Sequence, residues 1–450
     1  MGTEGAPLAK DGPPFPVEPW VMAVLGQLWQ NGHAAYLVGG GVRDALLGRP
    51  VSDWDVATDA RPERILEVFP GGTYQNRFGT VQARGLEVTT FRRDHRYADH
   101  RRPDSVTFSN DVYEDLARRD LTINAIAWGN RGSGSTSRVI DPADGQGDLR
   151  ARLVRAVGDP RQRFEEDALR LLRAVRIAAH LDFSIEPVTL AAMRSHAADI
   201  GWVSEERMGS EVRRMLVGER PSRAFLLLRE TGILASTLPE LQALVGSDGV
   251  AGQGGFVRSL DALDAATALA PGDERLALAA LLCETGPAPA REALDRLRIA
   301  ARDAEAIGML IRAAAVEYAA GWTDAQVRRY MAGLPADLLD DLLVLRRARL
   351  IAGDEAAAGR EQHLAERVRA QRIEASPLSL AELAIDGRDL RDTLGIPESP
   401  AIGIILERLL RDVIEDPTLN RPLTLLTRAS LIRDELAKDT SVEAQRPRIG

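Results

Sequence analysis

The sequence has little cysteine and no long apolar run, and each absence excludes a class of protein. Its one cysteine, Cys283, excludes an internal disulfide framework and a zinc site built on cysteines, so we expect a buried thiol. No apolar run approaches the ~20 residues needed to span a bilayer, and residues 1–16 lack the apolar centre of a signal peptide. We therefore expect a cytoplasmic protein with a flexible tail over residues 1–16.

Lysine is also scarce. Lys10 and Lys438 are the only lysines in 450 residues, so arginine carries most of the basic charge. The net charge of −9 disfavours a nucleic-acid partner, because phosphate binding usually leaves a basic footprint. The arginines are clustered, however, at 92–102, at 118–119 and between 150 and 176. Position in the chain is therefore a better guide to the partner than the net charge.

Length and periodicity divide the chain. With 450 residues, 45% of them hydrophobic and 27% charged, it has ample core for two to four domains. Residues 17–150 alternate short β-type runs with turns, whereas the pattern after about residue 150 is helical. Residues 241–256 contain five glycines and predict a linker. Residues 257–370 predict helices without a chemical motif.

The stretch YLVGGGVRDALLGRPVSDWDV, residues 36–56, has the features of a nucleotide-binding turn. A β-type run at 36–38 meets three glycines, and a short helix is predicted over 42–47. Glycines let the backbone approach a phosphate closely, and a helix start directs free N–H groups at an anion. Arg43 lies in the first turn, where its donors suit a phosphate oxygen. By itself, a glycine-rich turn is more often only a turn.

A second strand is predicted over 52–56. On it, Asp53 and Asp55 project to one face while Trp54 faces away. Two adjacent carboxylates suit magnesium, which prefers carboxylates, waters and substrate phosphates. A lone Asp-x-Asp is more often a solvated loop. The combination of glycine turn and paired aspartates is what predicts a nucleoside triphosphate site.

Gly-Gly, a twelve-residue spacer and Asp-apolar-Asp-apolar together resemble the signature of the polymerase-β-like nucleotidyltransferase superfamily. The continuation GGGVRDALLG is similar to the branch that contains tRNA CCA-adding enzymes and bacterial poly(A) polymerases. This resemblance implies an α+β fold, with an N-terminal polymerase-β-like nucleotidyltransferase β-sheet head followed by an all-helical neck, body and tail. We expect these parts at 17–150, 151–241, 257–370 and 371–450.

A hairpin is predicted from 78–84 to 86–92, with Glu87 and Thr89 on one face of its second strand. If this strand lies beside the aspartate strand, Glu87 becomes a third carboxylate near the metal. An exposed strand glutamate is the plainer alternative. The family keeps a carboxylate in a strand that an arginine follows, as here, so the resemblance favours a catalytic Glu87.

Residues 93–107 (RDHRYADHRRPDSVT) are charged and aperiodic, which predicts a mobile basic loop or a solvated loop without a role. They resemble the flexible loop that family members use when they switch to the terminal adenosine. DLARRDLTINAIA at 115–127 resembles the family's RRD motif, although alone it could be a salt-bridged helix start. The resemblance implies that Arg119 and Asp120 contact the sugar and triphosphate of the nucleotide.

One helix is predicted over 163–181 (RFEEDALRLLRAVRIAAHL), because apolar residues recur at helical spacing. Asp167 and Arg170 lie three apart on one face, where an ordinary surface ion pair is one interpretation. A carboxylate accepts hydrogen bonds and a guanidinium donates them, so the pair also matches cytosine and adenine, which present an amino donor beside a ring-nitrogen acceptor. Uracil and guanine present the reverse and would leave groups unpaired.

The string EDALRLLRAVR resembles the family's template motif, so Asp167 and Arg170 are expected to select CTP and ATP. Arg173 and Arg176 match the motif too. They drift off the Asp167 face, which suits contact with the triphosphate or RNA better than base reading. Residues 384–425 resemble the family's tail, which grips the outer part of tRNA.

The resemblance implies a class II tRNA nucleotidyltransferase with Asp53, Asp55 and Glu87 as catalytic groups. The 3′-OH of tRNA would attack the α-phosphate of CTP or ATP, and pyrophosphate would leave. Two Mg2+ ions on Asp53 and Asp55 would activate the hydroxyl and stabilise charge on the attacking and leaving oxygens. Gly40 and Arg43 are expected to hold nucleotide phosphate together with the RRD arginine.

Several alternatives share these motifs. Arg101-Arg102-Pro103 in the basic loop argues against CC-only addition, and an acidic chain without a basic tail disfavours poly(A) synthesis. A-only addition stays open. A catalytically silent tRNA-binding protein would be expected to lose the aspartates, and the tail resemblance argues against a protein or small-molecule substrate. Residues 257–370 contain no His-Asp doublet, so the sequence does not indicate the phosphohydrolase domain that some relatives have. The oligomeric state does not follow from the sequence.

Overall fold

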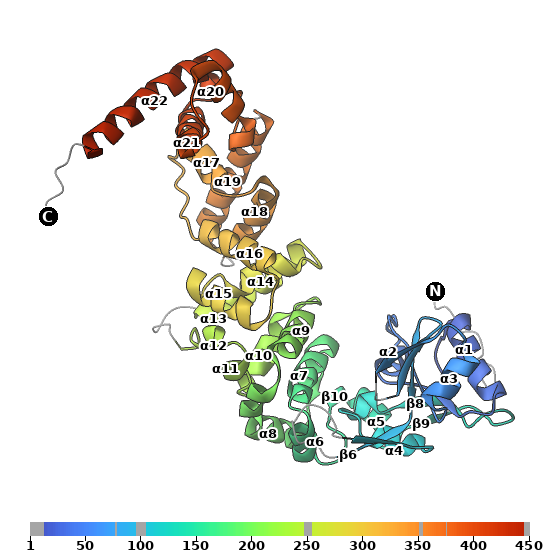
Figure 1. Cartoon of the computed structure of the whole chain (residues 1–450). Coiled ribbons are helices and arrows are strands. Elements are labelled where there is room, and N and C mark those ends of the chain that lie inside the picture. The colour runs from blue at the N-terminus through green and yellow to red at the C-terminus, as the bar shows by residue number, and fades with distance from the viewer. Residues whose placement is uncertain are drawn as a thin grey trace, which may run out of the picture. The chain divides into compact units, whose positions relative to one another are not determined.

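The computed structural model describes residues 13–76, 79–95, 105–246, 254–350, 354–374 and 376–444. The chain divides into two compact units, which Figure 1 shows in one view of the whole chain. The predicted α+β class is confirmed, because a mixed sheet lies near the amino terminus and helices dominate the chain after it. The first unit is Met1–Val245 with Ala293–Ile299, and the second is Gly246–Glu292 with Ala300–Gly450.

The predicted neck, body and tail divide the helical part more finely than these two units, and that division stays a prediction. Residues 1–12 of the predicted flexible tail lie outside the described residues. Phe15 is buried and stacks on Trp54 with ring centroids 6.1 Å apart. The packed structure therefore begins before the predicted residue 17, because burying a large aromatic ring outweighs the entropy of a short free segment.

Within the described part of the chain, the main sheet has seven strands in the order β3-β4-β5-β2-β1-β8-β9. Neighbouring strands are antiparallel except β2 and β5, which run parallel. The predicted hairpin is confirmed, since β4 and β5 pair across Arg84 and Gly85, whose positive φ values of 52° and 85° suit a tight turn. The strands are β1 (Ala35–Val38), β2 (Asp55–Thr58), β3 (Thr73–Asn76), β4 (Thr80–Ala83), β5 (Leu86–Thr90), β8 (Ala127–Asn130) and β9 (Arg138–Ile140).

Apolar residues at alternate strand positions pack against helices and so bury the faces of the sheet. On one face, Tyr36, Val38 and Ala57 form a core with Val112 and Leu116 of helix α4. Helix α1 packs on β1, and α3 packs on β4 and β5. The helices of this part are α1 (Pro19–Gln30), α2 (Gly40–Leu46), α3 (Pro62–Val68), α4 (Val112–Ala117), η1 (Thr122–Asn124) and α5 (Gly145–Ala151).

The segment predicted as a basic loop is a strand at each end. β6 (Arg92–His95) and β7 (Ser105–Phe108) pair antiparallel, so the prediction of loop structure is wrong for these residues. Backbone hydrogen bonding fixes such a ladder whatever the charge of its side chains, and Arg93 also pairs with Glu114 of α4. The middle of the segment, 96–104, lies outside the described residues and includes Arg101-Arg102-Pro103.

The single helix predicted over 163–181 is two helices, α6 (Pro160–Glu166) and α7 (Leu169–Leu181). Asp167 between them is extended, with φ −151° and ψ 104°. Its carboxylate accepts a 3.0 Å hydrogen bond from the Leu169 N–H, as aspartate often does at a helix start. The predicted apolar stripe is nevertheless buried, with Leu171 and Leu172 fully inside.

The rest of the first unit is helical apart from a small parallel sheet of β10 (Leu153–Val154) and β11 (Ser184–Ile185). Helix α9 and helix α10 both pack against α7. These helices are α8 (Pro187–Ser195), η2 (Ala197–Trp202), α9 (Glu205–Met215), α10 (Ser222–Glu230), α11 (Leu234–Thr237) and α12 (Pro239–Gln242). The last residues of α15 (Pro287–Arg296) also belong to this unit.

The second unit is drawn from yellow-green to red in Figure 1 and consists of helices throughout its described residues. α13, α14, α16 and α18 pack together, and α20 to α22 surround an apolar core that includes Leu390, Ile405, Leu409 and Leu425. The helices are α13 (Gly255–Leu269), α14 (Glu274–Leu282), α16 (Ala301–Ala314), α17 (Asp324–Ala332), η3 (Ala336–Leu338), α18 (Leu339–Ala348), α19 (Glu355–Ile373), η4 (Leu380–Glu382), α20 (Gly387–Leu394), α21 (Pro400–Glu415), η5 (Pro417–Leu419) and α22 (Pro422–Ala444).

Candidate active site

The glycine turn between β1 and α2 lies against the start of β2. A Cβ on Gly39, which has φ +77°, would lie 3.4 Å from Oδ2 of Asp55. A Cβ on Gly41 would lie 2.9 Å from the carbonyl oxygen of Asp53, closer than such atoms approach. Glycine is needed at both positions, for its left-handed backbone at one and for its missing side chain at the other. α2 begins at Gly40, two residues before its predicted start, so its first turn lies beside the aspartates.

The predicted carboxylates lie at one edge of the sheet. β2 begins at Asp55 rather than at the predicted residue 52, so Asp53 precedes the strand. Asp55 pairs with Val38 on one side and with Glu87 on the other, which confirms that the Glu87 strand neighbours the aspartate strand. Trp54 is buried and Asp53 is exposed, as expected for neighbours that point to opposite sides.

Negative charge is concentrated at this edge. Burial raises the pKa of Asp55; Arg119 opposes the rise, and the charges of Glu87 and Asp53 add to it. A divalent cation would relieve this repulsion, and the two aspartates offer the oxygen donors that magnesium prefers, so the residues fit such an ion. Within the described residues, no three acidic, histidine or cysteine side chains converge on one metal position.

Arg43 is held by protein groups. Its guanidinium donates to both carboxylate oxygens of Asp44, at 2.9 and 2.8 Å, and to Oδ1 of Asn124 at 2.8 Å. Asn124 in turn donates to Asp120 at 3.2 Å. Arg43 therefore ties the glycine turn to the RRD segment, and a phosphate contact would have to share or replace these bonds.

The RRD residues follow the end of α4 and do not begin a helix. The buried Asp115 accepts from Nη2 of Arg118 at 2.6 Å and from Nη2 of Arg119 at 3.2 Å. Burial alone would raise the pKa of Asp115, but the two guanidiniums hold it below its usual range. Nε of Arg119 is buried without a hydrogen-bond partner among the described residues, so it is a donor that a ligand can satisfy.

Asp120 joins the sheet domain to α7. Its Oδ2 accepts a 2.7 Å hydrogen bond from Nε of Arg173. Burial would raise the pKa of Asp120, but the Arg173 guanidinium, together with Asn124, holds it far below its usual range, and the pKa of Arg173 is raised in return. The pair is therefore permanently charged and fixed in position.

Asp167 and Arg170 do not form the surface ion pair that was one interpretation of their spacing. The helix break separates them, and Nη1 and Nη2 of Arg207 donate to Asp167 at 3.2 and 2.7 Å. Arg170 donates to Glu166 at 2.6 Å and to the carbonyl oxygen of Arg118 at 3.2 Å. Sequence reasoning misses Arg207, because its partner is 40 residues away in the chain and no local pattern marks the pair.

The predicted template residues and the RRD residues nevertheless meet at one cavity of about 350 Å³. Charged side chains dominate its walls, as expected for a pocket that receives a polar base or a phosphate. Arg176 lies elsewhere and donates to Glu211 at 2.7 Å. The cavity is lined by Arg118, Arg119, Asp120, Asp167, Leu169, Arg170, Arg173 and Arg207.

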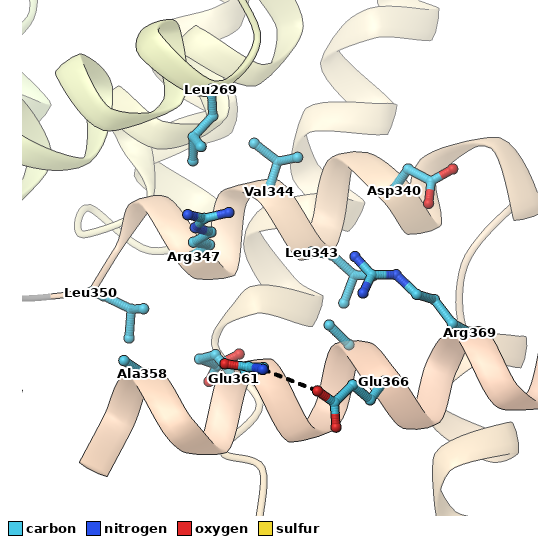
Figure 2. A pocket seen from close by; sticks show the side chains of 12 residues that line it. Leu269, Asp340, Leu343, Val344, Arg347, Leu350, Ala358, Glu361, Glu366 and Arg369 are labelled. Atoms are coloured by element: carbon cyan, nitrogen blue, oxygen red, sulfur yellow. Dashed lines mark hydrogen bonds between the residues drawn. The ribbon is translucent and has the colours of Figure 1, made fainter. Parts of the chain in front are cut away.

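A larger groove of about 650 Å³ lies between α18 and α19 of the second unit (Figure 2). Its floor is apolar, with Leu343 and Val344 on α18 and Leu269 on α13. Two of its acidic residues are paired with arginines, Glu361 with the buried Arg346 and Asp340 with Arg372. Its charged side chains, such as Arg347 and Arg369, belong to no motif that the sequence singles out, so the cavity of the first unit is the better candidate active site.

Three family models match the chain in succession. "Poly A polymerase head domain" covers residues 35–155, which is the sheet domain. The model described as "Probable RNA and SrmB- binding site of polymerase A" matches residues 182–244, and "tRNA nucleotidyltransferase domain 2 putative" matches residues 270–429. The matches follow the order predicted from the motifs, with a sheet domain before the helical parts.

Relatives match over almost the whole chain. The CCA-adding enzyme of Geobacillus thermodenitrificans is 36% identical over 416 residues, 91% of this chain and 95% of that protein. The chain belongs to the CCA-adding enzyme family. The CCA-adding enzyme of Lactococcus lactis subsp. cremoris is 33% identical over 412 residues, 90% of this chain and 94% of that protein.

Solved structures of the CCA-adding enzyme family agree with this fold. The crystal structure of the Bacillus stearothermophilus CCA-adding enzyme in complex with CTP has a TM-score of 0.72 and 29% identity, and the match covers 94% of this chain and all of that one. The Thermotoga maritima CCA-adding enzyme complexed with tRNA shares the fold, with a TM-score of 0.61, 20% identity and a match over 92% of this chain and 96% of that one. In the described part of this family member, no helix has the length and apolar character to cross a membrane.

Proposed function

We propose that this chain adds C, C and A in turn to the 3′ end of tRNA, using CTP and ATP and releasing pyrophosphate. The observation that carries the proposal is that Asp167 and Arg170 line one cavity together with the RRD residues. Arg119 links this cavity to the carboxylate edge, because it lines the cavity and its charge also acts on Asp55. Because protein side chains of this pocket would recognise the base beside the carboxylate pair, the nucleotide addition needs no RNA template. The titles of related structures, which name CTP and tRNA as their ligands, support these substrates.

The transfer forms a bond between the tRNA 3′ oxygen and the α-phosphorus, and it breaks the bond from that phosphorus to pyrophosphate. Members of this family are generally metal-dependent. A divalent cation held by Asp53 and Asp55, which we propose to be Mg2+, supplies hydroxyl activation and charge stabilisation. The chain's own contribution is to orient the triphosphate, through the glycine turn and the Nε of Arg119, so that its α-phosphate faces the tRNA end.

Base selection is assigned to Asp167 and Arg170. Asp167 accepts the amino group of cytosine or adenine with the lone pairs that Arg207 leaves free, because an ionised carboxylate has about four acceptor positions. Arg170 donates to the neighbouring ring nitrogen. Since Arg207 and Glu166 already hold these two side chains, the pocket is preorganised and cannot rotate to accept uracil.

The test uses purified protein, Mg2+ and three tRNA transcripts that end at the discriminator base, at C and at CC. Each is incubated with CTP, with ATP and with both, and the products are read at single-nucleotide resolution. We expect the shortest transcript to gain C, C and A and then stop. Asp53→Ala is the control, since it should abolish transfer while tRNA binding remains.

Each other outcome selects one of the alternatives. Extension of only the CC-ended transcript, by one A, would identify an A-adding enzyme, and a stop after CC would identify a CC-adding enzyme. Continued addition of A would identify a poly(A) polymerase. No extension of any transcript, with tRNA still bound, would identify a silent tRNA-binding protein. A tRNA substrate would place the protein in the cytoplasm, as the sequence predicts.

A further inference from the structure

Trp54 stands between the two aspartates in sequence but points away from them into the protein. Its side chain is buried, and its ring stacks on Phe15 at 6.1 Å between centroids with an interplanar angle of 22°. The opposite contact is the glycine turn, since a Cβ on Gly41 would lie 2.8 Å from Cε3 of the indole. The indole therefore fills the space between the amino-terminal segment and the first turn of α2.

The indole is also held by a polar anchor. Nε1 of Trp54 donates a 2.7 Å hydrogen bond to Oε2 of Glu18. Glu18 is the residue before α1, and its carbonyl oxygen accepts from the N–H groups of Val21 and Met22 at 3.0 and 3.2 Å. Helix α1 packs on β1, so the anchor is itself fixed to the sheet. A short hydrogen bond from a buried donor to a carboxylate fixes the direction of the ring as well as its depth.

The two aspartates depend on this anchor to different degrees. Asp55 is the first residue of β2 and is paired with Val38 and Glu87, so the sheet itself holds it. Asp53 is exposed and precedes the strand. Oγ of Ser52 donates to Oδ2 of Asp53 at 3.2 Å, and Trp54, the next residue in the chain, is buried, so the place of Asp53 depends on where the indole is held.

We propose that Trp54 is a positioning residue that, anchored by Glu18 and Phe15, sets the place of Asp53 beside Asp55 and so the affinity of this pair for a divalent cation. The inference rests on the proposed function, because it takes the two aspartates as the metal-binding pair. Two carboxylates on flexible backbone would lose entropy on closing around an ion, and preorganisation removes that loss. A purely structural indole would affect the stability of the protein and leave the affinity for metal unchanged.

The test measures metal binding directly in the full-length protein. Free Mn2+ is quantified by electron paramagnetic resonance during titration, and the Mg2+ concentration for half-maximal transfer is measured in parallel. We expect Glu18→Ala and Trp54→Phe each to weaken Mn2+ binding about fivefold, the effect of one hydrogen bond to an exposed carboxylate. Glu18→Gln should bind Mn2+ nearly as the unchanged protein does, because its amide oxygen still accepts from the indole.

The double variant Glu18→Ala/Trp54→Phe should bind Mn2+ no more weakly than either single variant, because all three lack the same bond. Glu63→Ala, which removes an exposed glutamate from α3, is the control for the change in net charge. Unchanged Mn2+ affinity in Glu18→Ala, or the same loss in Glu63→Ala, overturns the proposal. The Glu18 variants keep the indole, so the test stands even if Trp54→Phe fails to fold.

Asp53→Asn separates this inference from the proposed function. If Asp53→Asn loses Mn2+ binding and Glu18→Ala does not, the metal pair stands and the positioning role fails. If Asp53→Asn binds Mn2+ as tightly as the unchanged protein, the metal assignment itself fails, and the positioning role fails with it.

Discussion

The carboxylate edge and the arginine-lined cavity lie in the same unit but handle charge in opposite ways. At the edge, burial and the neighbouring Glu87 and Asp53 raise the pKa of Asp55, although Arg119 opposes this. At the cavity, Arg173 outweighs the burial of Asp120 and lowers its pKa. The edge keeps unbalanced negative charge, which favours a cation, whereas each aspartate that lines the cavity is paired with an arginine.

The second difference is rigidity. In the described part of the cavity region, acidic side chains are each held by an arginine from another segment, as Asp167 is by Arg207 and Asp120 is by Arg173. Such pairs hold both side chains in fixed positions, so base selection relies on geometry that exists before the nucleotide arrives. At the edge, Asp55 is fixed by the sheet and Asp53 lies outside it. The comparison predicts different responses of the two regions to mutation and to pH.

The largest effect is expected from Asp55→Asn. Transfer should fall at least about 1,000-fold, because the edge loses a charge that metal binding and transition-state stabilisation need. The stability of the folded protein, in contrast, should increase. A carboxyl whose pKa is raised by folding is less stable as an anion in the folded protein at pH 7, so its removal should raise Tm by about 2 °C. Single-turnover transfer and calorimetry measure the two effects.

Asp120→Asn is the matched variant at the cavity. Its pKa is lowered by folding, so its charge stabilises the folded protein at pH 7, and its loss leaves Arg173 without a charged partner. Tm should therefore fall, by several degrees for a free-energy loss of about 3 kcal/mol. Equal signs of the two Tm shifts would contradict the contrast in charge balance.

The next effect is on nucleotide choice. Asp167→Ala should reduce discrimination of CTP against UTP by about 10- to 100-fold, because the amino group of cytosine loses its acceptor. Loss of the α7 cap and of the Arg207 pair should also cost about 1–2 kcal/mol of stability. The ratio of kcat/KM values for the two nucleotides on a tRNA transcript measures the selection.

Asp159→Ala is the control for this effect. Asp159 caps α6 with a 3.0 Å hydrogen bond from the Arg161 N–H and does not line the cavity. It should lower stability by a similar amount and leave selection unchanged. If Asp167→Ala keeps the discrimination of the unchanged protein, the template role is wrong.

The pH dependence of rate and of nucleotide binding should differ. Because the pKa of Asp55 is raised, this carboxyl takes up a proton at higher pH than usual, and kcat should fall about tenfold per pH unit below that value. Asp120 keeps its charge in the same range, because its pKa is lowered. KM for CTP should therefore stay within about twofold while kcat falls. Steady-state kinetics at a fixed metal concentration below saturation checks this, because bound metal would itself lower the pKa of Asp55. A parallel loss of kcat and of affinity for CTP would contradict the prediction.

The smallest effect is expected at Arg176. It donates to Glu211 outside the cavity, so Arg176→Met should change KM for CTP by less than about twofold and mainly lower stability. Arg173 lines the cavity, so Arg173→Met should raise KM for CTP more strongly than Arg176→Met does. Similar KM values for the two variants would remove the distinction between the two arginines.

Local rules in the sequence predict the carboxylate edge well. Alternation along a strand places Trp54 opposite Asp53, and the Arg84-Gly85 turn sets the hairpin that brings Glu87 to its strand. The register of Asp55 with Glu87 then follows from one pairing of neighbouring strands. The same rules place the strand start too early, because Asp53 has a strand-like neighbourhood in sequence but no strand partner in the sheet.

The cavity is harder to predict, because its geometry depends on contacts between distant segments. An uninterrupted helix would place Asp167 three residues before Arg170 on one face, but the aspartate caps α7 and turns to Arg207 instead. The periodic apolar residues are the same for one helix or two, so they do not report the break. The only local sign of the break is the aspartate in the middle of the apolar pattern.

By itself, the sequence determined the order of the sheet domain and the helices, the two aspartates of the edge and most of the charged residues of the cavity, but it missed Arg207. Tertiary structure decided which charges are paired. Arg207 reaches Asp167, Arg173 reaches Asp120 and Glu18 reaches Trp54 only after packing brings their segments together. Hydrogen bonds are set by distance and direction in space, and neither is encoded in local spacing along the chain.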